Sequence, residues 1–521
     1  MVDTIRLYPP AAERSDRTLT KQVQATAYDN IAKAAGLTTP FEAISVEQTP
    51  TFLKEPIAVA DFAVGVVGAV GTSAAELAQA RGLPGQEVAV DRRHAVMSFN
   101  DGMYHYMNGV VILGGEIMVP VNGFYQDKAG QWMCFNGAYP HLRDGILKYF
   151  DAPHDQDALI RQIAKHDAAK IEADFAEMGL CMAPMHSHDE WLAHPQGEAM
   201  RDLPILTMEK FGDAKGRVLP EAKHRPMEGV RVIDVTHVVA GPWATRVMAD
   251  MGADVISIRN PAFPFLYPMI FSESYGKKQI LLHFKMQKSL ARFKELLKDA
   301  DVLCWGYAPG SLDRLGLDRD TLRALNPNLV VTHVSAYGPK GPWSQRKGWE
   351  QLSQTCAGMV VAASQGRPQH HLVAALPNDY ATGYLAAIGA MAALKHRQEQ
   401  GGFWEVNAML TRTAMEMMAL PHEPEDAVPN AIEADAKYLV DQDSDFGAVF
   451  TKLAPPARLS KTPAFSATGP AVNGTHPPFD TGWDAFHPSS GEVTHRPTAM
   501  ADKIYGFLAG FGHEDIMLRK E

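Results

Sequence analysis

The chain has 521 residues, 46% hydrophobic and 21% charged, an ordinary composition that is long enough for two or three domains with large cores. Its formal net charge of -11 argues against nucleic acid and anionic membranes as partners, because the chain has no overall attraction for phosphate. The four cysteines have neither CxxC nor zinc spacing, so we expect reduced thiols, no metal site and a cytoplasmic location.

The N-terminal part of the sequence is predicted to be mainly helical. Its first residues carry charges rather than an apolar core segment, so we expect no signal peptide. The sequence contains no run of 18 apolar residues, so we also expect no membrane span. An Ala- and Gly-rich helix occupies much of 56–110, and the segment GQEVAVDRRHAVMSF that follows it is interpreted as a strand.

The next part of the chain, over 110–200, mixes short apolar pieces with one strongly helical stretch. In this stretch, DALIRQIAKHDAAKIEADFAEMG, apolar residues recur at helical spacing. The run from Gly212 to Met227 is rich in Gly, Pro and charged residues, and we interpret it as a linker.

From Gly229 onward, short β-branched runs alternate with helical stretches. Near-continuous apolar strands separated by helices predict a buried parallel sheet, and therefore a doubly wound α/β domain. Ligands of such domains bind outside the carboxyl ends of the strands, so the segments VTHVVAGP, WGYAPGS and SAYGPKGPW are expected to cluster there. The predicted strands are 230–235, 253–259, 301–307 and 329–338, and the helices between them include 241–252 and 287–300.

After about residue 420 the sequence becomes rich in Pro, Gly and Ser and loses its periodicity. We expect extended segments that wrap around the rest of the protein. A last helix, MADKIYGFLAGFG, is predicted near the end of the chain.

Two helical segments of the chain match each other. Relative to Asp61 and to Asp379, both have Gly at +4 and +10, Ala-Ala at +13 and +14, and Val at +27. This pattern favours an internal duplication, although alanine-rich helices also resemble each other by chance. The alternative for each aspartate is a purely structural role, in which its side chain caps free N–H groups at the start of the helix.

Residues 229–410 resemble the family III CoA transferases, the group of formyl-CoA transferase and carnitine CoA-transferase. Order and spacing both fit over roughly 180 residues, which is more specific than any single glycine motif. The matching stretches are GVRVIDVTHVVAGPWATRVMADMGADVISI, YGKKQILLHF, ADVLCWGYAPGSLDRLGL, NPNLVVTHVSAYGPKGPW, KGWEQLSQTCAG and NDYATGYLAAIGAMAALKHR.

The resemblance implies a rearranged domain order. In the family, the nucleotide-fold half comes first and a small domain follows, whereas here segments resembling the small domain come first. Asp61 has no nucleotide-fold half before it, so we favour a structural or vestigial role for it. The implied units are an N-terminal helical segment (1–110), a small α+β domain (111–225), a Rossmann-like CoA-binding and catalytic domain (226–420) and a C-terminal wrapping segment (421–521).

The resemblance also implies a catalytic carboxylate. The aspartate that opens the DxxTG helix is the family's nucleophile, and here it is Asp379. In the family mechanism this carboxylate attacks an acyl-CoA, forms a mixed anhydride and then an aspartyl-CoA, from which a carboxylic acid takes the CoA. Glu350 matches an acidic position beside the active site, and we assign it a supporting hydrogen-bond role, with an ordinary surface carboxylate as the alternative.

Further positions match those that bind CoA in the family. Lys347 and Lys277 match lysines that line the CoA site, and Tyr307 matches an aromatic residue near the adenine. The loop of Val238, Val239 and Ala240 matches the one that packs on CoA. Coenzyme A is expected as substrate and product, without a permanently bound cofactor. Arg314, Arg346 and Lys278 are neighbours of these matched positions only.

The sequence departs from the family pattern after the second strand, where Arg259 is shifted by one residue relative to the usual phosphate-binding arginine. The family also includes α-methylacyl-CoA racemases, whose histidine falls at Trp349 here. Tryptophan cannot shuttle protons, which disfavours a racemase unless His237 substitutes. A CoA-ester lyase and a non-catalytic CoA-binding protein stay open as alternatives.

The sequence does not reveal which acyl group the CoA thioester carries. Trp349, Trp343, Met359 and Tyr380 are candidates for an apolar pocket. Acyl-CoA and a carboxylic acid are the expected partners. The resemblance implies a homodimer of interlocked chains, but the rearranged order also allows one chain to close on itself.

Overall fold

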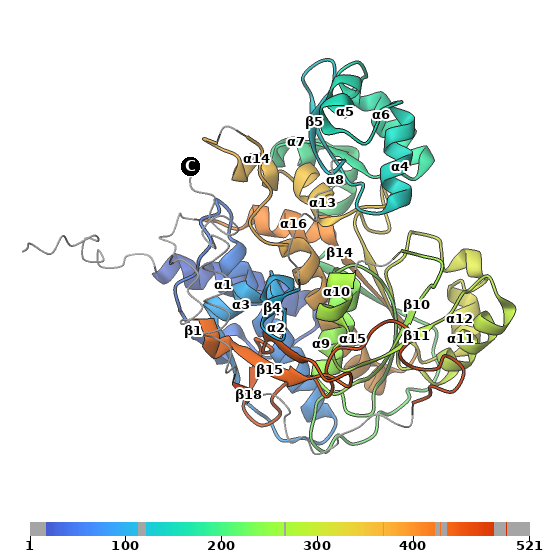
Figure 1. Cartoon of the computed structure of the whole chain (residues 1–521). Helices are drawn as coiled ribbons and strands as arrows, with labels where there is room; N and C mark the ends of the chain where they lie inside the picture. The colour runs from blue at the N-terminus through green and yellow to red at the C-terminus, as the bar shows by residue number, and fades with distance from the viewer. Residues whose placement is uncertain are drawn as a thin grey trace, which may run out of the picture.

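The computed structural model of the chain describes residues 17–112, 121–264, 267–367, 369–422, 428, 435–483 and 496–497. Its centre is a seven-stranded sheet in which all strands except the last run parallel (Figure 1). In spatial order the strands are β11 (Lys277–Leu281), β10 (Asp254–Arg259), β9 (Arg231–Val235), β12 (Val302–Trp305), β13 (Val330–Ser335), β14 (Phe403–Met409) and the antiparallel β8 (Leu206–Phe211).

The strands of this sheet are apolar on both faces, as the sequence predicts for a doubly wound domain. Val232 and Val255 face one core, whereas the next residues along the same strands, Ile233 and Ile256, face the other. The first face is covered by α9 (Ala240–Asp250) and α15 (Pro377–Gln400), and the second by α11 (Gln287–Asp299) and α12 (Arg319–Leu325).

The N-terminal helices pack against α15. They are α1 (Arg17–Ala35) and α2 (Val59–Ala80), and the hydroxyl of Ser73 in α2 donates to the carbonyl oxygen of Ile388 at 3.3 Å. Among the described helices, α2 is the one that is long and apolar enough to cross a membrane, but 89% of its apolar window is buried inside the protein. The two helices that start with Asp61 and Asp379 in their first turn therefore lie side by side.

The segment after α2 is only partly a strand. β2 (Val88–Asp91) pairs with β1 (Ile44–Glu47) and β17 (Arg458–Leu459), but α3 (Arg92–Ser98) follows at once. The prediction of a strand through to Phe99 is wrong because Asp91 caps a helix, its carboxylate accepting the N–H groups of Arg93 and His94.

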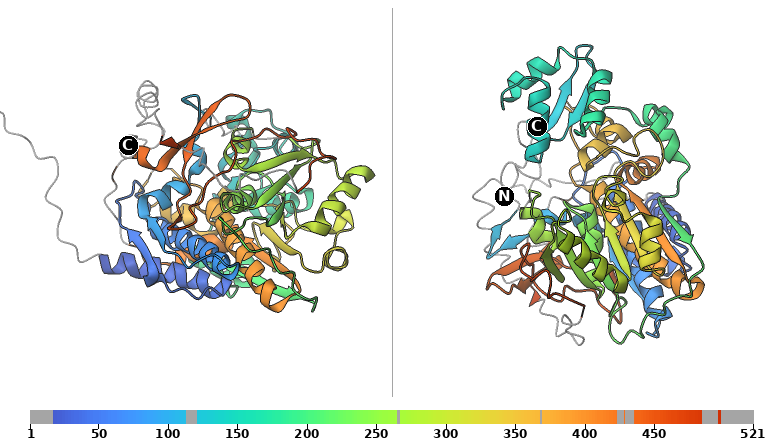
Figure 2. Two further views of the ribbon diagram at one scale, coloured as in Figure 1. Left: turned by 90° about the horizontal axis from the view of Figure 1, so that it is seen from below. Right: turned by 90° about the vertical axis from the view of Figure 1, so that its right-hand side faces the viewer.

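The small domain projects from the rest of the molecule (Figures 1 and 2). Its antiparallel sheet consists of β5 (Gly123–Gln126), β6 (Trp132–Phe135) and β7 (Met182–Pro184). The single predicted helical stretch is two helices, because Asp167 caps a new start. β8 belongs to the large sheet, although its residues fall inside the range predicted for the small domain. The helices of the small domain are α4 (Pro140–Tyr149), α5 (Gln156–Ile163), α6 (Ala168–Met178), α7 (His188–Ala193) and α8 (Pro195–Arg201).

The described part of the tail is mostly extended along the large domain. β15 (Leu439–Asp443) and β16 (Val449–Leu453) form a hairpin that joins β3 (Tyr106–Met107), β4 (Val110–Val111) and β18 (Arg496–Pro497) in one sheet. Farther on, the N–H of His476 donates to the carbonyl oxygen of Gln279 on β11. The predicted last helix lies outside the described residues. The remaining helices are α10 (Tyr267–Glu273), α13 (Glu350–Ala357), α14 (Met359–Ala363) and α16 (Leu410–Ala419).

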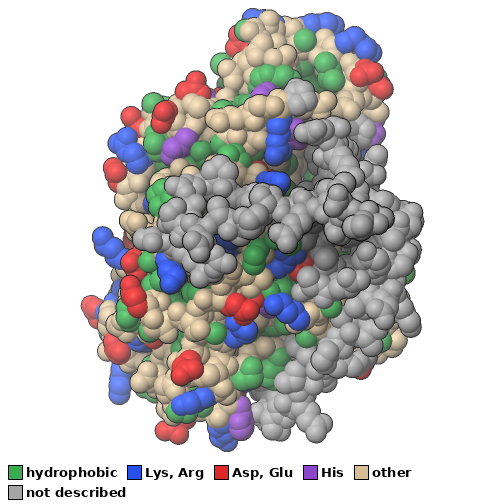
Figure 3. Space-filling view, turned by 90° about the vertical axis from the view of Figure 1, so that its left-hand side faces the viewer, with side chains coloured by type: hydrophobic (Ala, Val, Ile, Leu, Met, Phe, Trp, Pro, Cys, Tyr) green, Lys and Arg blue, Asp and Glu red, His purple; other side chains and the backbone are tan. Residues whose placement is uncertain are grey.

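Acidic and basic side chains are interspersed on the face shown in Figure 3. All four cysteines are buried and free. Within the part of the chain that the structure describes, no group of three or more His, Cys, Asp and Glu gathers in a metal-binding arrangement.

Candidate active site

A cavity of about 190 Å³ opens at the carboxyl edge of the large sheet. Three of its walls are the segments that follow β9, β12 and β13, so the predicted clustering of these loops is confirmed. The start of α15 and the small domain supply the remaining walls. The loop residues that line it include His237 to Gly241, Gly306 to Pro309 and Val334 to Ala336.

Asp379 reaches this cavity from the first turn of α15. No side chain caps this helix at Leu376, and Pro377 occupies its first position, where a missing N–H costs nothing. The carboxylate of Glu350 satisfies the next two donors, accepting the N–H of Asp379 at 2.6 Å and that of Asn378 at 3.3 Å. The expected supporting role of Glu350 is therefore a contact with the backbone of Asp379 itself.

The two carboxyl groups are strongly perturbed by their surroundings. Asp379 is 9% exposed and Glu350 is 1% exposed. Burial raises the pKa of Asp379 to about 7. Burial, and then the nearby charge of Asp379, raise the pKa of Glu350 well above its usual range. The pair therefore resists carrying two negative charges at once, so its titration belongs to both groups together.

The loop facing Asp379 has an unusual backbone. Val238 has a φ of 71°, which is rare and strained for a β-branched residue. Directly after it, α9 begins at Ala240 without a side-chain cap. Its first N–H groups are thus donors beside the cavity, at the positive end of a helix dipole. An oxyanion that forms near Asp379 needs donors of this kind.

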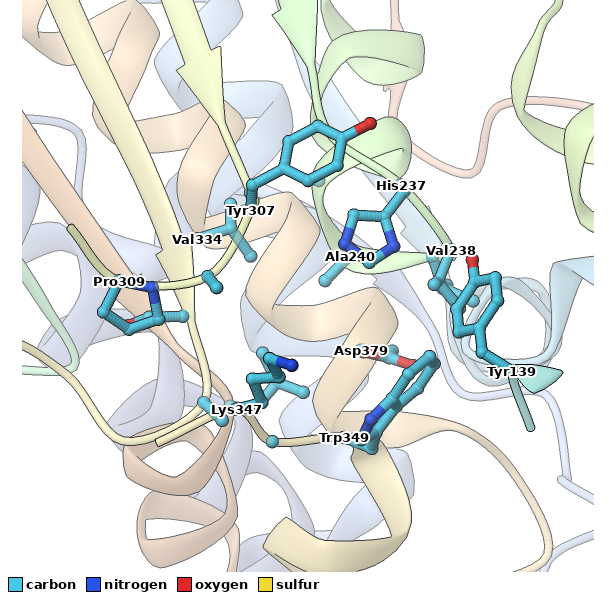
Figure 4. A pocket seen from close by; sticks show the side chains of 18 of the residues that line it. Tyr139, His237, Val238, Ala240, Tyr307, Pro309, Val334, Lys347, Trp349 and Asp379 are labelled. Atoms are coloured by element: carbon cyan, nitrogen blue, oxygen red, sulfur yellow. The ribbon is translucent and has the colours of Figure 1, made fainter. Parts of the chain in front are cut away.

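Aromatic rings line much of the cavity (Figure 4). The ring centroids of Tyr139 lie 5.6 Å from Trp349 and 5.1 Å from Phe263, and those of His237 and Tyr307 lie 4.8 Å apart. Burial lowers the pKa of His237 to about 4, with the charge of Arg259 acting in the same direction. The imidazole is therefore neutral at physiological pH.

The small domain contributes Tyr139, His141 and Leu142 to the cavity, at the start of α4. Sequence reasoning assigned no site role to these residues. They lie more than two hundred positions before Asp379, in the segment FNGAYPHLRDGILKYF, which resembles the family's small domain but gave no site assignment, so only the folded chain brings them to the cavity. The site therefore contains large-domain and small-domain residues of the same chain.

The region from 227 to 431 matches the family model described as CoA-transferase family III. The matched region includes strands β9 to β14 and the whole of α15. It also includes every large-domain residue named above as lining the cavity.

Individual relatives match this family III region at moderate identity. The β subunit of succinyl-CoA–L-malate CoA-transferase from Chloroflexus aurantiacus is 32% identical over 36% of this chain and 49% of its own. A probable fatty acyl-CoA transferase from Mycobacterium tuberculosis is 32% identical over 34% of this chain and 48% of its own. A crystal structure of a hypothetical protein from the same organism is 32% identical, with a TM-score of 0.35 over 38% of this chain and 57% of that one. The chain thus spans about half the length of these relatives.

The structure brings most of the predicted site residues of the family III region together. Besides Asp379, the cavity is lined by Val238, Val239, Ala240, Tyr307 and Lys347. Lys347 donates to the carbonyl oxygen of Gly179 at 2.9 Å, at the end of α6. Of the four residues named for an apolar pocket, Trp349 lines the cavity, whereas Trp343, Met359 and Tyr380 do not.

Lys277 lies elsewhere, and its assignment to the CoA site requires correction. Its side chain is fully buried, and Nζ donates to Asp234 Oδ2 at 3.1 Å, to Thr245 Oγ1 at 2.7 Å and to the carbonyl oxygen of Pro242 at 2.7 Å. All three donors of the ammonium are used. Although burial opposes it, this cation lowers the pKa of Asp234 to about 2. Lys277 therefore fastens β11 to β9 and α9.

Arg259 is the cation whose role the sequence left in doubt. It is 5% exposed, and its Nε is buried without a hydrogen-bond partner among the described residues. Its charge acts on His237 and on Tyr307, both of which line the cavity. The charge of the shifted arginine therefore still acts on residues of the cavity wall.

Asp61 has the structural surroundings that we favoured for it. Its Oδ1 accepts from Arg92 Nε at 2.9 Å and from Gln24 Nε2 at 2.8 Å, and it is 5% exposed. This carboxylate is thus engaged by a buried guanidinium and a buried amide, and it does not line the cavity of Asp379. The two matching helices thus differ sharply in the environment of their aspartates.

Proposed function

We propose that this protein is a CoA transferase that moves CoA from an acyl-CoA thioester to a carboxylic acid, with Asp379 as the covalent nucleophile. The observation that carries this proposal is the position of Asp379, buried at one end of a cavity and held by Glu350 through its own backbone N–H. A carboxylate needs no general base to attack, only access and partial desolvation.

The proposed reaction has four balanced displacements. A carboxylate oxygen of Asp379 attacks the thioester carbonyl carbon, the C–S bond breaks, and CoA leaves as a thiolate. The thiolate then attacks the aspartyl carbonyl carbon of the mixed anhydride, which releases the acyl group as a carboxylate and leaves an aspartyl-CoA thioester. The acceptor carboxylate attacks this thioester and expels the thiolate, and the thiolate finally attacks the acceptor carbonyl and regenerates the Asp379 carboxylate.

The residues around Asp379 have separate tasks in this reaction. The uncapped start of α9 donates N–H groups to the oxyanions. Trp349, Tyr139 and Val238 exclude water, which would hydrolyse an anhydride. Lys347 lines the cavity as a cation for the phosphates of CoA, and the charge of Arg259 acts on the cavity wall. Glu350 positions Asp379 and does not touch the substrate.

A racemase is the second reaction to be tested. His237 shares the cavity with Asp379, but its lowered pKa, about 4, makes it a weak base. An α-proton exchange that incorporates deuterium from solvent without CoA transfer would show that the protein is a racemase and not a transferase.

The proposal is tested by trapping the intermediate. Incubation with an acyl-CoA and hydroxylamine is expected to convert Asp379 to a hydroxamate, located by peptide mass spectrometry. Asp379→Asn should abolish labelling and transfer while CoA binding persists, and Asp61→Asn, on the matching helix, should still be labelled at Asp379. CoA binding to the wild-type chain without labelling or transfer, under conditions that saturate the site, would make it a non-catalytic CoA-binding protein.

A further inference from the structure

Aromatic and aliphatic side chains make up much of the cavity wall around Asp379. Figure 4 shows Tyr139, Val238 and Trp349 on the same side of the cavity as Asp379, with Tyr307 and Pro309 on the other side. Tyr139 and Trp349 contact each other, with ring centroids 5.6 Å apart. Surfaces of this type favour flat or branched apolar groups.

Both cations that line the cavity, Arg346 and Lys347, contact the small domain. Arg346 Nη1 lies 2.8 Å from Glu172 Oε1 on α6, and its guanidinium stacks over Trp343 at 4.4 Å. Lys347 donates to Gly179 at the end of the same helix. The two histidines that line the cavity, His237 and His141, both have a pKa lowered by burial. A negative group at the acyl end of the cavity, the end where Asp379 lies, would therefore have to compete with the phosphates of CoA for Lys347.

The acyl end already has two buried carboxyl groups, Asp379 and Glu350. Burial raises the pKa of Asp379, so a further carboxylate beside it would be repelled and poorly solvated. The reacting carboxylate of the acceptor avoids this repulsion, because it enters when Asp379 is a neutral thioester. A second carboxylate at the far end of an acyl chain would be present at every step.

We infer that the site takes an uncharged, apolar acyl group, with an aromatic or branched monocarboxylic acid as its source, and that Tyr139 of the small domain determines this preference. The inference rests on the proposed function, because it describes the acyl end of the same site. It separates this chain from the relative whose name specifies succinyl-CoA and L-malate, both of which are dicarboxylic substrates.

Binding to a chain that cannot react tests the inference without relying on catalysis. In Asp379→Asn, we expect benzoyl-CoA to bind at least tenfold more tightly than succinyl-CoA, as measured by isothermal titration with free CoA as the reference. Tighter binding of succinyl-CoA than of benzoyl-CoA, or equal binding, would overturn the inference.

Substitution of Tyr139 tests the assignment of specificity. Tyr139→Phe retains the ring and should retain the preference, whereas Tyr139→Arg adds a cation and should shift kcat/KM toward succinyl-CoA by at least tenfold relative to benzoyl-CoA. An unchanged ratio in a folded Tyr139→Arg variant would remove Tyr139 from this role.

The two proposals fail differently. Transfer from succinyl-CoA at a higher kcat/KM than from benzoyl-CoA in the wild-type chain would overturn the acyl preference and leave the transferase intact. Selective binding of benzoyl-CoA without hydroxamate formation would support the acyl preference and overturn the proposed function.

Discussion

The surroundings of Asp379, the proposed nucleophile, oppose the ionisation of its carboxyl group. Burial raises its pKa to about 7, so near neutral pH the carboxyl is divided between its two forms. Glu350 holds the backbone of Asp379 in place, while burial and the charge of Asp379 oppose the ionisation of Glu350 itself. Glu350 therefore fixes the position of the nucleophile.

The pH dependence of the reaction should show the raised pKa of Asp379. Only the ionised carboxyl attacks, so we expect kcat/KM to rise with pH through about 7 and to fall about tenfold per unit below pH 6. Glu350→Gln leaves Asp379 buried, so this limb should stay near pH 7. The measurement is a pH–rate profile from pH 5.5 to 9 for both chains. A limb that moves to lower pH in Glu350→Gln would show that a charge on Glu350, and not burial, raises the pKa of Asp379.

The same group should make stability depend on pH. Because the pKa of Asp379 is higher in the folded chain than in an unfolded one, its stabilising contribution is complete below about pH 4 and is lost as pH rises through about 7. Asp379→Asn mimics the neutral form, so we expect it to stabilise the chain at pH 8 by roughly 1–3 kcal/mol, and much less at pH 5. Thermal unfolding at the two pH values measures this. An equal shift at both would show that the charge is not the cause.

Single residues differ in how well the sequence predicts them. Asp379, Val238 and Tyr307 directly follow strands or open a helix, so the topology alone carries them to the cavity edge. Lys277 lies within β11, a strand that the sequence did not reveal, and the direction of a strand side chain reverses at each residue. Tyr139 comes from a distant segment and gave no local signal.

At the scale of elements, the position of α15 depends on its close approach to α9. A Cβ on Gly383 would lie 2.5 Å from the carbonyl oxygen of Ala240 and 2.9 Å from Trp243 Cδ1. These distances leave no room for a methyl group, and the nearest atom is backbone. Gly383 therefore lets the Asp379 helix reach the loop that supplies the oxyanion donors.

Gly383→Ala should separate these two elements. We expect a loss of about 1–3 kcal/mol in unfolding free energy and a decrease in kcat of at least about tenfold, because α15 moves away from the loop. Gly389→Ala is a matched control, since its Cβ would meet Val406 Cγ1 at 2.4 Å, far along the helix from the cavity. It should cost stability with little change in kcat. Equal effects on kcat would mean that Gly383 has no special role.

The elements themselves were predicted where their pattern was long and periodic. β9, β10, β12 and β13 appear within a few residues of their predicted bounds because buried parallel strands are continuous apolar runs. β8 was missed because it is an edge strand with polar residues and lies far from its partner β14 in the sequence. Only long-range pairing defines such a strand.

At the scale of the whole molecule, the cavity is closed by the small domain of the same chain. Tyr139 and Asp379 line one cavity, although a linker and six of the seven strands of the large sheet separate them in the sequence. The expectation of an interlocked homodimer is therefore not needed to complete the site.

Mixing two defective chains tests this closure. The Asp379→Asn chain lacks the nucleophile but has an intact small domain. The Tyr139→Arg chain has the nucleophile but an altered small-domain wall. With benzoyl-CoA, co-expressed chains carrying different tags should have no more activity than the Tyr139→Arg chain supplies alone. Recovery of wild-type turnover per reconstituted site would show that the small domain acts on a neighbouring chain instead.

The ion pair between Asp61 and Arg92 has a consequence for counting catalytic centres. The two matching helices lie side by side, but of their two aspartates only Asp379 lines the cavity. The molecule should accordingly behave as a solitary centre, with hyperbolic saturation and a covalent stoichiometry of at most one label per 57.0-kDa polypeptide.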